Sequence, residues 1–219
     1  MSQMPKSFRQ RVTKTVGCRY LLHLPEDYAR TRKRWPLMLF LHGAGERGDD
    51  LALVKKHGPP KFLDDRPDFP CIVVSPQCPA EEWWDTTVLV ALLDRVSKLY
   101  RVDPQRIYVT GLSMGGYGTW ALALAQPQRF AAIVPVCGGG NRLLAKRIAH
   151  LPVWVFHGAE DEIVPLEQSE RMVDALRAAG AEPQFTVYED VGHDSWTETY
   201  ANPELYEWLL AQRRQKPSA

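Results

Sequence analysis

The chain has 219 residues, of which 45% are hydrophobic and 24% charged, and its formal net charge is +1. This length and hydrophobic content suit one domain over residues 1–219 with a substantial core. A net charge so close to zero provides no field that would attract nucleic acid or an anionic membrane, so we expect a small-molecule partner.

The first residues and the cysteines predict a cytoplasmic protein. Residues 1–9 lack the apolar segment of a signal peptide, and no later apolar run approaches the length of a membrane span. The four cysteines show neither a C-x-x-C motif nor zinc-ligand spacing, so we expect mostly buried thiols and no metal site. Cys71 and Cys78 flank a predicted strand, and whether they pair stays open. We expect a monomer or a small homo-oligomer.

The first predicted element is an antiparallel hairpin within residues 7–24. Residues 19–24 alternate in polarity as a strand does, and β-branched and basic residues surround Gly17. Beyond this hairpin, apolar runs and helical periods alternate along the chain. The predicted strands are 36–42, 69–75, 106–110, 130–137, 152–157 and 184–188, and the predicted helices are 87–101, 114–126, 142–150, 166–179 and a last one from 202. Asp-Pro at 103–104 predicts a turn. This alternation predicts an α/β fold, a mostly parallel sheet with helices on both faces.

A serine between glycines directly follows the strand predicted at 106–110. Residues 110–116 read Thr-Gly-Leu-Ser-Met-Gly-Gly, with Ser113 at the centre. A strand that turns sharply into a helix exposes the side chain at its apex, and only glycine fits two residues before and after it. The unpaired backbone N–H groups at the start of that helix favour the negative charge that develops during acyl transfer. Ser113 is therefore the candidate nucleophile.

A serine hydroxyl needs a base to remove its proton, and six histidines compete for that role. Loops that follow parallel strands meet at one edge of the sheet, which favours a histidine in such a loop. His193, in Gly-His-Asp-Ser-Trp after the last strand, meets this condition. His42 and His157 also end strands, but we expect them to pack the strand ends and orient loops. The remaining three are expected to be structural or solvated: His23, His57 and His150.

The acid that orients the base is expected in the loop after the strand at 152–157. Three adjacent carboxylates stand there, and Asp161 is preferred over its glutamate neighbours because its short side chain is held more rigidly. The order serine, acid, histidine along the chain also matches that of hydrolases whose nucleophile occupies such a sharp strand-to-helix turn. Asp190 and Asp194 are the alternative acids.

A tetrahedral intermediate requires N–H donors for its oxyanion. The backbone N–H of Met114 is one candidate, and that of Ala44, between two glycines, is the other. The same loop contains Gly-Ala-Gly-Glu-Arg-Gly at 43–48, which matches a dinucleotide-binding motif. Three acidic residues crowd the place where a phosphate would bind, which argues against that alternative: Glu46, Asp49 and Asp50. We expect no cofactor.

These motifs together resemble a known family, the single-domain carboxylesterases of the α/β-hydrolase superfamily. Its members are related to prolyl-oligopeptidase-type and polyhydroxyalkanoate-depolymerase-like enzymes. The matching segments are 41–45, 75–79 with Trp83 and Trp84, 103–116, 157–165 and 192–196. The resemblance implies an α/β-hydrolase fold with Ser113, Asp161 and His193 as the triad. The serine nucleophile is unlike that of dienelactone hydrolases, which use cysteine.

The predicted fold leaves no room for a lid. Residues 138–151 accommodate only one short helix, so we expect an open site suited to soluble short-acyl or aryl esters. Trp83 and Trp84 follow a central strand and could wall the substrate pocket. The expected activity is that of a serine carboxylesterase. The alternatives are a peptidase or acyl-peptide hydrolase, a polyester or feruloyl-type esterase, and a non-catalytic binding protein on this fold.

Overall fold

The computed structural model describes residues 3–214. Its centre is a seven-stranded sheet in the order β1-β3-β2-β4-β5-β6-β7. The strands are β1 (Tyr20–His23), β2 (Trp35–Leu41), β3 (Ile72–Pro76), β4 (Val102–Leu112), β5 (Ala132–Val136), β6 (Trp154–Gly158) and β7 (Gln184–Tyr188). Only β1 runs antiparallel to its neighbour, β3, and all other neighbouring strands are parallel.

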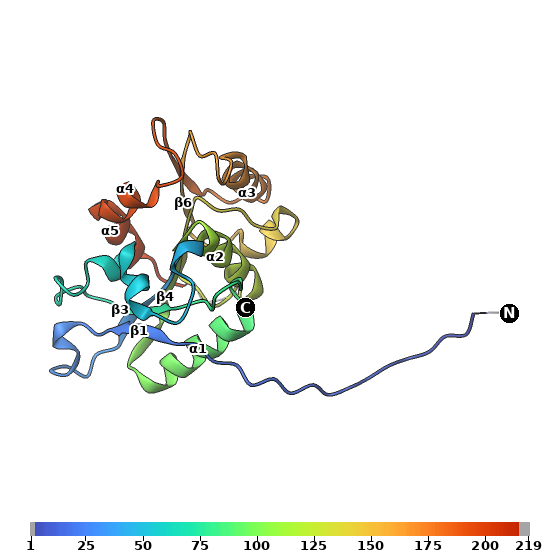
Figure 1. The fold of residues 1–219 in the computed structure, drawn as a ribbon, viewed down its shortest axis with the longest axis horizontal. Helices are drawn as coiled ribbons and strands as arrows, with labels where there is room; N and C mark the ends of the chain where they lie inside the picture. The colour runs from blue at the N-terminus through green and yellow to red at the C-terminus, as the bar shows by residue number, and fades with distance from the viewer. Residues whose placement is uncertain (1–2, 215–219) are drawn as a thin grey trace.

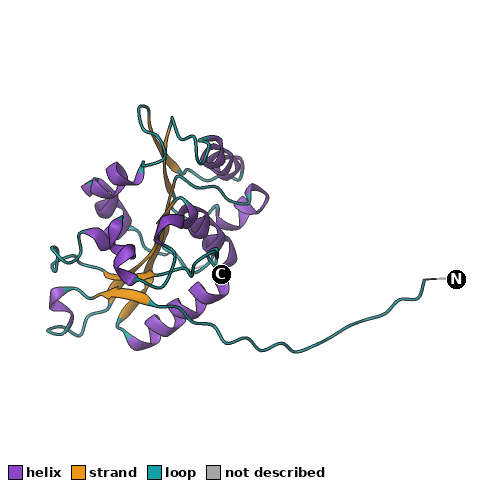
Figure 2. Cartoon of the chain, in the orientation of Figure 1, coloured by secondary structure: helices purple, strands orange, loops and turns teal. Residues whose placement is uncertain are grey.

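Helices cover both faces of the sheet, which Figure 2 shows nearly edge-on. The α-helices are α1 (Thr86–Leu99), α2 (Met114–Ala125), α3 (Glu167–Ala178), α4 (Trp196–Ala201) and α5 (Pro203–Ala211). Short 3₁₀ helices are η1 (Glu26–Tyr28), η2 (Ala44–Glu46), η3 (Leu51–Lys56), η4 (Pro59–Lys61) and η5 (Arg142–Ile148). In Figure 1, α4 and α5 lie on the opposite side of the sheet from α2 and α3.

The two faces have separate hydrophobic cores because strand side chains alternate. Along β2, Leu37, Leu39 and Leu41 pack into the core that α1, α2 and α3 cover. Met38 and Phe40 point to the opposite core, which α4 and α5 close. All of β2 is buried, as an apolar run in a doubly covered parallel sheet should be.

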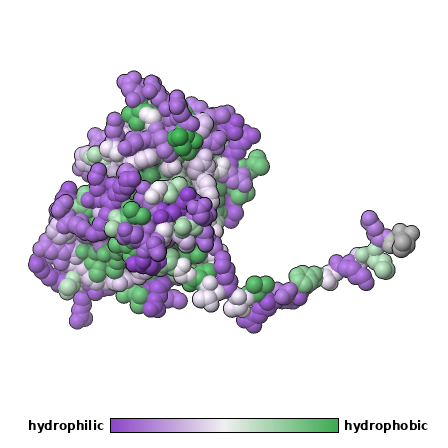
Figure 3. Space-filling model, in the orientation of Figure 1, coloured by the Kyte–Doolittle hydropathy of each residue, from purple (hydrophilic) through white to green (hydrophobic). Residues whose placement is uncertain are grey.

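The predicted N-terminal hairpin is wrong. Residues 3–19 form neither a strand nor a helix, and Figure 1 shows the first part of the chain running away from the body. In Figure 3 this segment stands clear of the surface, and it exposes Met4, Phe8 and Val12. Only the second predicted strand forms, as β1, and it pairs with the distant β3. Alternating sequence can predict a strand, but it does not specify the partner.

Three further elements differ from the predictions. The turn expected at Asp103-Pro104 is an irregularity inside β4, where the register with β2 moves from Trp35↔Val102 to Leu37↔Ile107. The helix expected at 142–150 is the shorter 3₁₀ helix η5. Helix α4 was not predicted, because its six residues are too few to show a helical period.

The arrangement places the carboxyl ends of β2, β3, β4, β6 and β7 at one edge of the sheet. The loops that follow these five strands carry the candidate site residues. Among the described residues, no helix is long and apolar enough to cross a membrane.

Candidate active site

Ser113 occupies a strained turn between β4 and α2. Its φ of 53° and ψ of −117° lie in a region that L-residues rarely adopt, which costs on the order of 1–3 kcal/mol. The flanking glycines are required by space: a β-carbon at Gly111 would lie 2.4 Å from the Gly115 carbonyl oxygen. One at Gly115 would lie 1.9 Å from the Leu41 carbonyl oxygen. The backbone N–H of Ser113 donates to the Val136 carbonyl at 3.0 Å, which holds the turn against β5.

The structure brings Ser113 and His193 into hydrogen-bond contact. The distance from Ser113 Oγ to His193 Nε2 is 2.9 Å, although the residues are 80 positions apart. The side chain of His193 is 21% exposed, so the imidazole is reachable from solvent without any rearrangement. Ser113 is also half-buried. The serine hydroxyl therefore has a base at the distance that proton transfer requires.

Asp161 is the acid that contacts this base. His193 Nδ1 donates to Asp161 Oδ2 at 2.7 Å, which leaves Nε2 as the acceptor for the serine proton. The other carboxylate oxygen accepts the backbone N–H groups of Ile163 at 2.9 Å and Val164 at 2.8 Å. The carboxylate has no solvent-exposed area. It is thus fixed by donors before any substrate arrives.

Of the alternative acids, Asp194 has a different role in the structure. Its carboxylate accepts both the backbone N–H and the hydroxyl of Thr197, at 3.1 and 3.0 Å, in the first turn of α4. Asp190 is exposed in the turn before His193. Among the described residues, neither hydrogen bonds to the imidazole of His193, whereas Asp161 does.

His42 and His157 orient loops, as their positions at strand ends predicted. The ring of His157 is fully buried and contacts Ser169 Oγ at 2.7 Å and the Val164 carbonyl at 2.8 Å. Its Nε2, which donates to the Val164 carbonyl, also lies 3.2 Å from Asp161 Oδ2. Burial lowers the pKa of His157, which favours the neutral ring.

The ring of His42 anchors the loop that follows β2. Its Nε2 accepts the backbone N–H of Cys78 at 3.0 Å, so its proton lies on Nδ1 and is donated to the Gly43 carbonyl at 2.6 Å. Burial lowers the pKa of His42 to about 4, so the ring is neutral near pH 7.

The candidate oxyanion donors belong to two segments, the start of α2 and the loop after β2. Met114 is the first residue of α2 and Ala44 the first of η2, and N–H groups at the start of a helix have no partner within it. A methyl group at Gly43 would lie 3.7 Å from Ser113 Cβ, so this loop is packed directly against the nucleophile. The N–H of Gly43 is already used, because it donates to Glu46 Oε2 at 3.0 Å.

The two candidate substrate-binding tryptophans point in different directions. Trp84 packs against the loop after β2 that carries Ala44, which we call the oxyanion loop. Its Nε1 donates to the His42 carbonyl at 3.2 Å, and the ring centroids of Trp84 and His42 are 4.8 Å apart. Trp83 is 64% exposed and packs edge-on against Tyr117, with ring centroids 6.1 Å apart. Tyr117 lies one helical turn after Ser113 and was missed by the sequence analysis, although that spacing could have identified it.

Cys137 is a second residue that the sequence analysis did not connect with the site. It follows β5, the neighbour of β4, and its Sγ accepts the N–H of Ser113 at 3.3 Å. Its sulfur lies within 4.8 Å of ligand atoms of Asp161 and His193, which is the only such cluster of potential metal ligands among the described residues. Burial raises the pKa of the thiol to about 12, so it is neutral. Because the imidazole and carboxylate already bind each other, we assign no metal to this cluster. All four cysteines are free, including Cys71 and Cys78.

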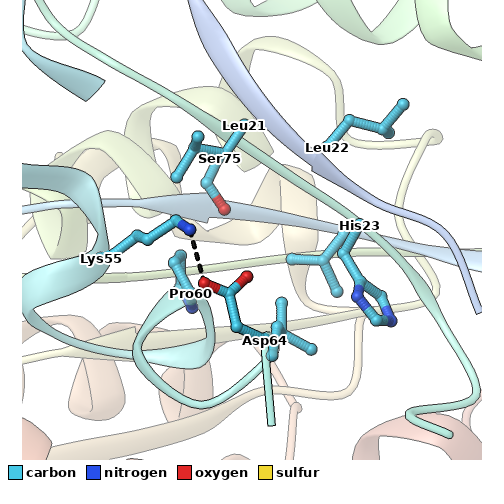
Figure 4. A pocket seen from close by; sticks show the side chains of 9 residues that line it. Leu21, Leu22, His23, Lys55, Pro60, Asp64 and Ser75 are labelled. Atoms are coloured by element: carbon cyan, nitrogen blue, oxygen red, sulfur yellow. Dashed lines mark hydrogen bonds and ion pairs between the residues drawn. The ribbon is translucent and has the colours of Figure 1, made fainter. Parts of the chain in front are cut away.

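A separate cavity of about 120 Å³ lies between β1 and the segment that contains η3 and η4. Figure 4 shows Lys55 and Asp64 inside it, paired at 2.5 Å, with His23 and Ser75 nearby. None of the three triad candidates lines this cavity. Its two charges neutralise each other, so we assign it no role.

Comparison with known proteins supports the fold. The chain is similar to a solved thermostable esterase, with 38% identity and a TM-score of 0.77 over 89% of this chain and 59% of that one. A solved ferulic acid esterase aligns with a TM-score of 0.68 over 87% of this chain and 91% of that one, but at 21% identity it shows the fold alone. The expected α/β-hydrolase fold is confirmed.

Among curated proteins, the chain is similar to a protein of Aspergillus terreus named "Probable feruloyl esterase C". The two are 28% identical over 163 residues, which cover 69% of this chain and 57% of the relative. The chain therefore spans less than two thirds of the length of this relative and of the thermostable esterase.

A family model described as "Dienelactone hydrolase family" matches residues 80–206, which include Ser113, Asp161 and His193. The separation from dienelactone hydrolases that we expected from the serine nucleophile is therefore wrong at the level of the family. The identity of one nucleophilic atom does not outweigh the pattern of the surrounding 127 residues. The chain belongs to the dienelactone hydrolase family of the α/β-hydrolase superfamily.

Proposed function

We propose that this protein is a serine carboxylesterase that works through an acyl-enzyme. The observation that carries the proposal is the pair of contacts from Ser113 Oγ to His193 Nε2 at 2.9 Å and from His193 Nδ1 to Asp161 at 2.7 Å. The family and the esterase relatives support the same activity. Such a chain activates a hydroxyl near neutral pH without a cofactor.

The reaction would proceed in two halves. Ser113 Oγ attacks the ester carbonyl carbon while His193 Nε2 takes the hydroxyl proton, and the N–H groups of Ala44 and Met114 stabilise the oxyanion. When the C–O bond to the alcohol breaks, His193 returns the proton to the leaving alcohol. Water then attacks the acyl-enzyme with the same base, and Ser113 is released with the free acid. Asp161 stabilises the imidazolium in both halves.

Catalytic variants test this assignment. Ser113→Ala and His193→Ala should each lower the turnover of 4-nitrophenyl acetate by at least about 10³-fold. A fluorophosphonate probe should label the wild type at Ser113 and leave Ser113→Ala unlabelled. Near-wild-type turnover in either variant would contradict the proposal. Comparing an ester with the matching anilide distinguishes an esterase from a peptidase that uses the same triad.

We further propose short-acyl or aryl esters as substrates, with Trp83 contacting the acyl or aryl group. Its exposed ring and its contact with Tyr117, one turn from Ser113, support this role. The contacts of Trp84 support a role in holding the oxyanion loop instead. The test varies the acyl group on a constant 4-nitrophenyl leaving group. Trp83→Ala should reduce turnover of the phenylpropanoyl ester but leave the acetyl ester within twofold; equal effects on both would contradict the proposal.

A cytoplasmic location is part of the proposal. Its support is that all four cysteines are free in the structure, as is usual in a reducing compartment. Fractionation of cells that express the protein from its own gene would test it, and recovery in the medium would contradict it.

A further inference from the structure

A buried carboxyl group accepts a hydrogen bond from the backbone of the oxyanion loop. Glu46 is only 4% exposed, although glutamate is seldom buried without partners. Its Oε2 accepts the N–H of Gly43 at 3.0 Å, and Gly43 lies against Ser113. Glu46 thereby fixes Gly43, and with it the following residue, Ala44, whose N–H group is the proposed donor to the substrate oxygen.

The second oxygen of this carboxyl group faces His57. The distance from Glu46 Oε1 to His57 Nε2 is 3.8 Å, which is an electrostatic contact longer than a hydrogen bond. On the other side of the ring, the indole N–H of Trp196 donates to His57 Nδ1 at 3.3 Å. Because Nδ1 accepts, the proton of the neutral ring lies on Nε2 and points toward the carboxyl group.

Trp196 connects this pair to the catalytic base. Its ring packs edge-on against His193, with centroids 5.1 Å apart and planes at 90°. It also packs against His57 at 5.4 Å. These contacts therefore connect the oxyanion loop after β2 with the loop after β7 that carries His193. The two strands are not neighbours in the sheet.

We propose that Glu46, His57 and Trp196 form a positioning bridge that sets the oxyanion loop against the catalytic histidine. The inference rests on the proposed esterase function, since it assigns a role in the same reaction. The role assigned to the three residues is positioning and requires no contact with the ester. The bridge acts by keeping the N–H group of Ala44 and Nε2 of His193 at the separation that the tetrahedral transition state requires.

Two conservative variants interrupt the bridge at different points. Trp196→Phe keeps an aromatic ring against His193 but removes the indole N–H, and Glu46→Gln keeps an acceptor for Gly43 but removes the charge that faces His57. The matched control is Trp154→Phe, since Trp154 donates a similar bond to Thr186 Oγ1 at 3.0 Å at the start of β6, the opposite end from the site.

For 4-nitrophenyl acetate, each bridge variant should lower kcat about tenfold or more and leave KM within twofold. The affinity for a trifluoromethyl ketone, which forms a tetrahedral adduct with the serine, should fall by the same factor as kcat/KM. A change in fold stability alone would not produce that equality. The control should retain wild-type kcat.

The double variant tests whether the residues act as one unit. If they do, Glu46→Gln combined with Trp196→Phe should lose little more than the worse single variant. Losses that multiply would overturn the proposal, as would a Trp196→Phe variant whose kcat equals that of Trp154→Phe. Should Trp196→Phe fail to fold, His57→Gln removes the same acceptor and carries the same expectation. If the wild type itself has no esterase activity, the proposed function fails instead, and the two failures are thereby distinguished.

Discussion

Replacing Asp161 with asparagine should remove most of the catalytic activity without unfolding the protein. The two backbone donors, Ile163 and Val164, can still bind the remaining oxygen of the introduced amide. The amide nitrogen would then face His193 Nδ1, where the carboxylate accepts at 2.7 Å in the wild type. Because two donors cannot face each other in a site with no solvent-exposed area, the imidazole must move its proton to Nε2. That atom can no longer accept the proton of Ser113.

The expected loss in kcat for Asp161→Asn is about 10⁴-fold, since a wrong tautomer affects every turnover. This corresponds to about 5 kcal/mol of transition-state stabilisation. The assay is the initial rate on 4-nitrophenyl acetate, with circular dichroism to confirm folding. Asp194→Asn is the matched control and should remain within twofold, because asparagine caps a helix as well as aspartate does. A loss below tenfold in Asp161→Asn would refute the reasoning.

Three further predictions concern stability and the thiols. Gly115→Ala should destabilise the fold by more than about 3 kcal/mol, because its β-carbon would lie 1.9 Å from the Leu41 carbonyl oxygen; Gly45→Ala, with no atom within 4 Å, is the control, and equal melting temperatures would contradict this. Between pH 6.5 and about 4 the unfolded chain binds a proton at His42 that the folded chain excludes. The free energy of unfolding should therefore decrease by about 3 kcal/mol as the pH is lowered through this window. Urea unfolding at pH 7 and 4.5 should show a smaller pH dependence in His42→Asn than in the wild type, and an unchanged dependence would contradict this. Ellman's reagent should react quickly with Cys18 alone in the native protein and with all four cysteines after unfolding; four fast thiols in the native state would refute the described burial.

Most of the fold could be predicted because its strands are long apolar runs and its helices have clear periods. Ser113 followed from the glycine-flanked turn after a predicted strand, and His193 from the rule that loops after parallel strands share an edge. The partner of β1 could not be predicted, since β3 is some fifty residues away and pairing depends on tertiary contacts. Likewise, the roles of Trp83 and Trp84 depend on which side of the loop each faces, which adjacent identical residues do not reveal.

The bridge of Glu46, His57 and Trp196 was also beyond sequence reasoning. His57 was expected to be structural or solvated, and Glu46 was considered only as a charge that disfavours phosphate. Their importance comes from contacts across 139 positions of chain between His57 and Trp196. No local pattern records such a separation, because it arises only when the sheet brings the loops after β2 and β7 to one edge.

The position of β7 has a consequence for how the protein would lose activity on heating. Within residues 3–214, this strand is an edge strand of the sheet, pairs only with β6, and has no fully buried residue. Edge strands open in local fluctuations that cost less free energy than unfolding the whole molecule. The loop that begins where β7 ends carries His193, so the base is attached to one of the least protected parts of the sheet. Thermal inactivation would then begin below the temperature at which the central strands melt, and it would be reversible on cooling.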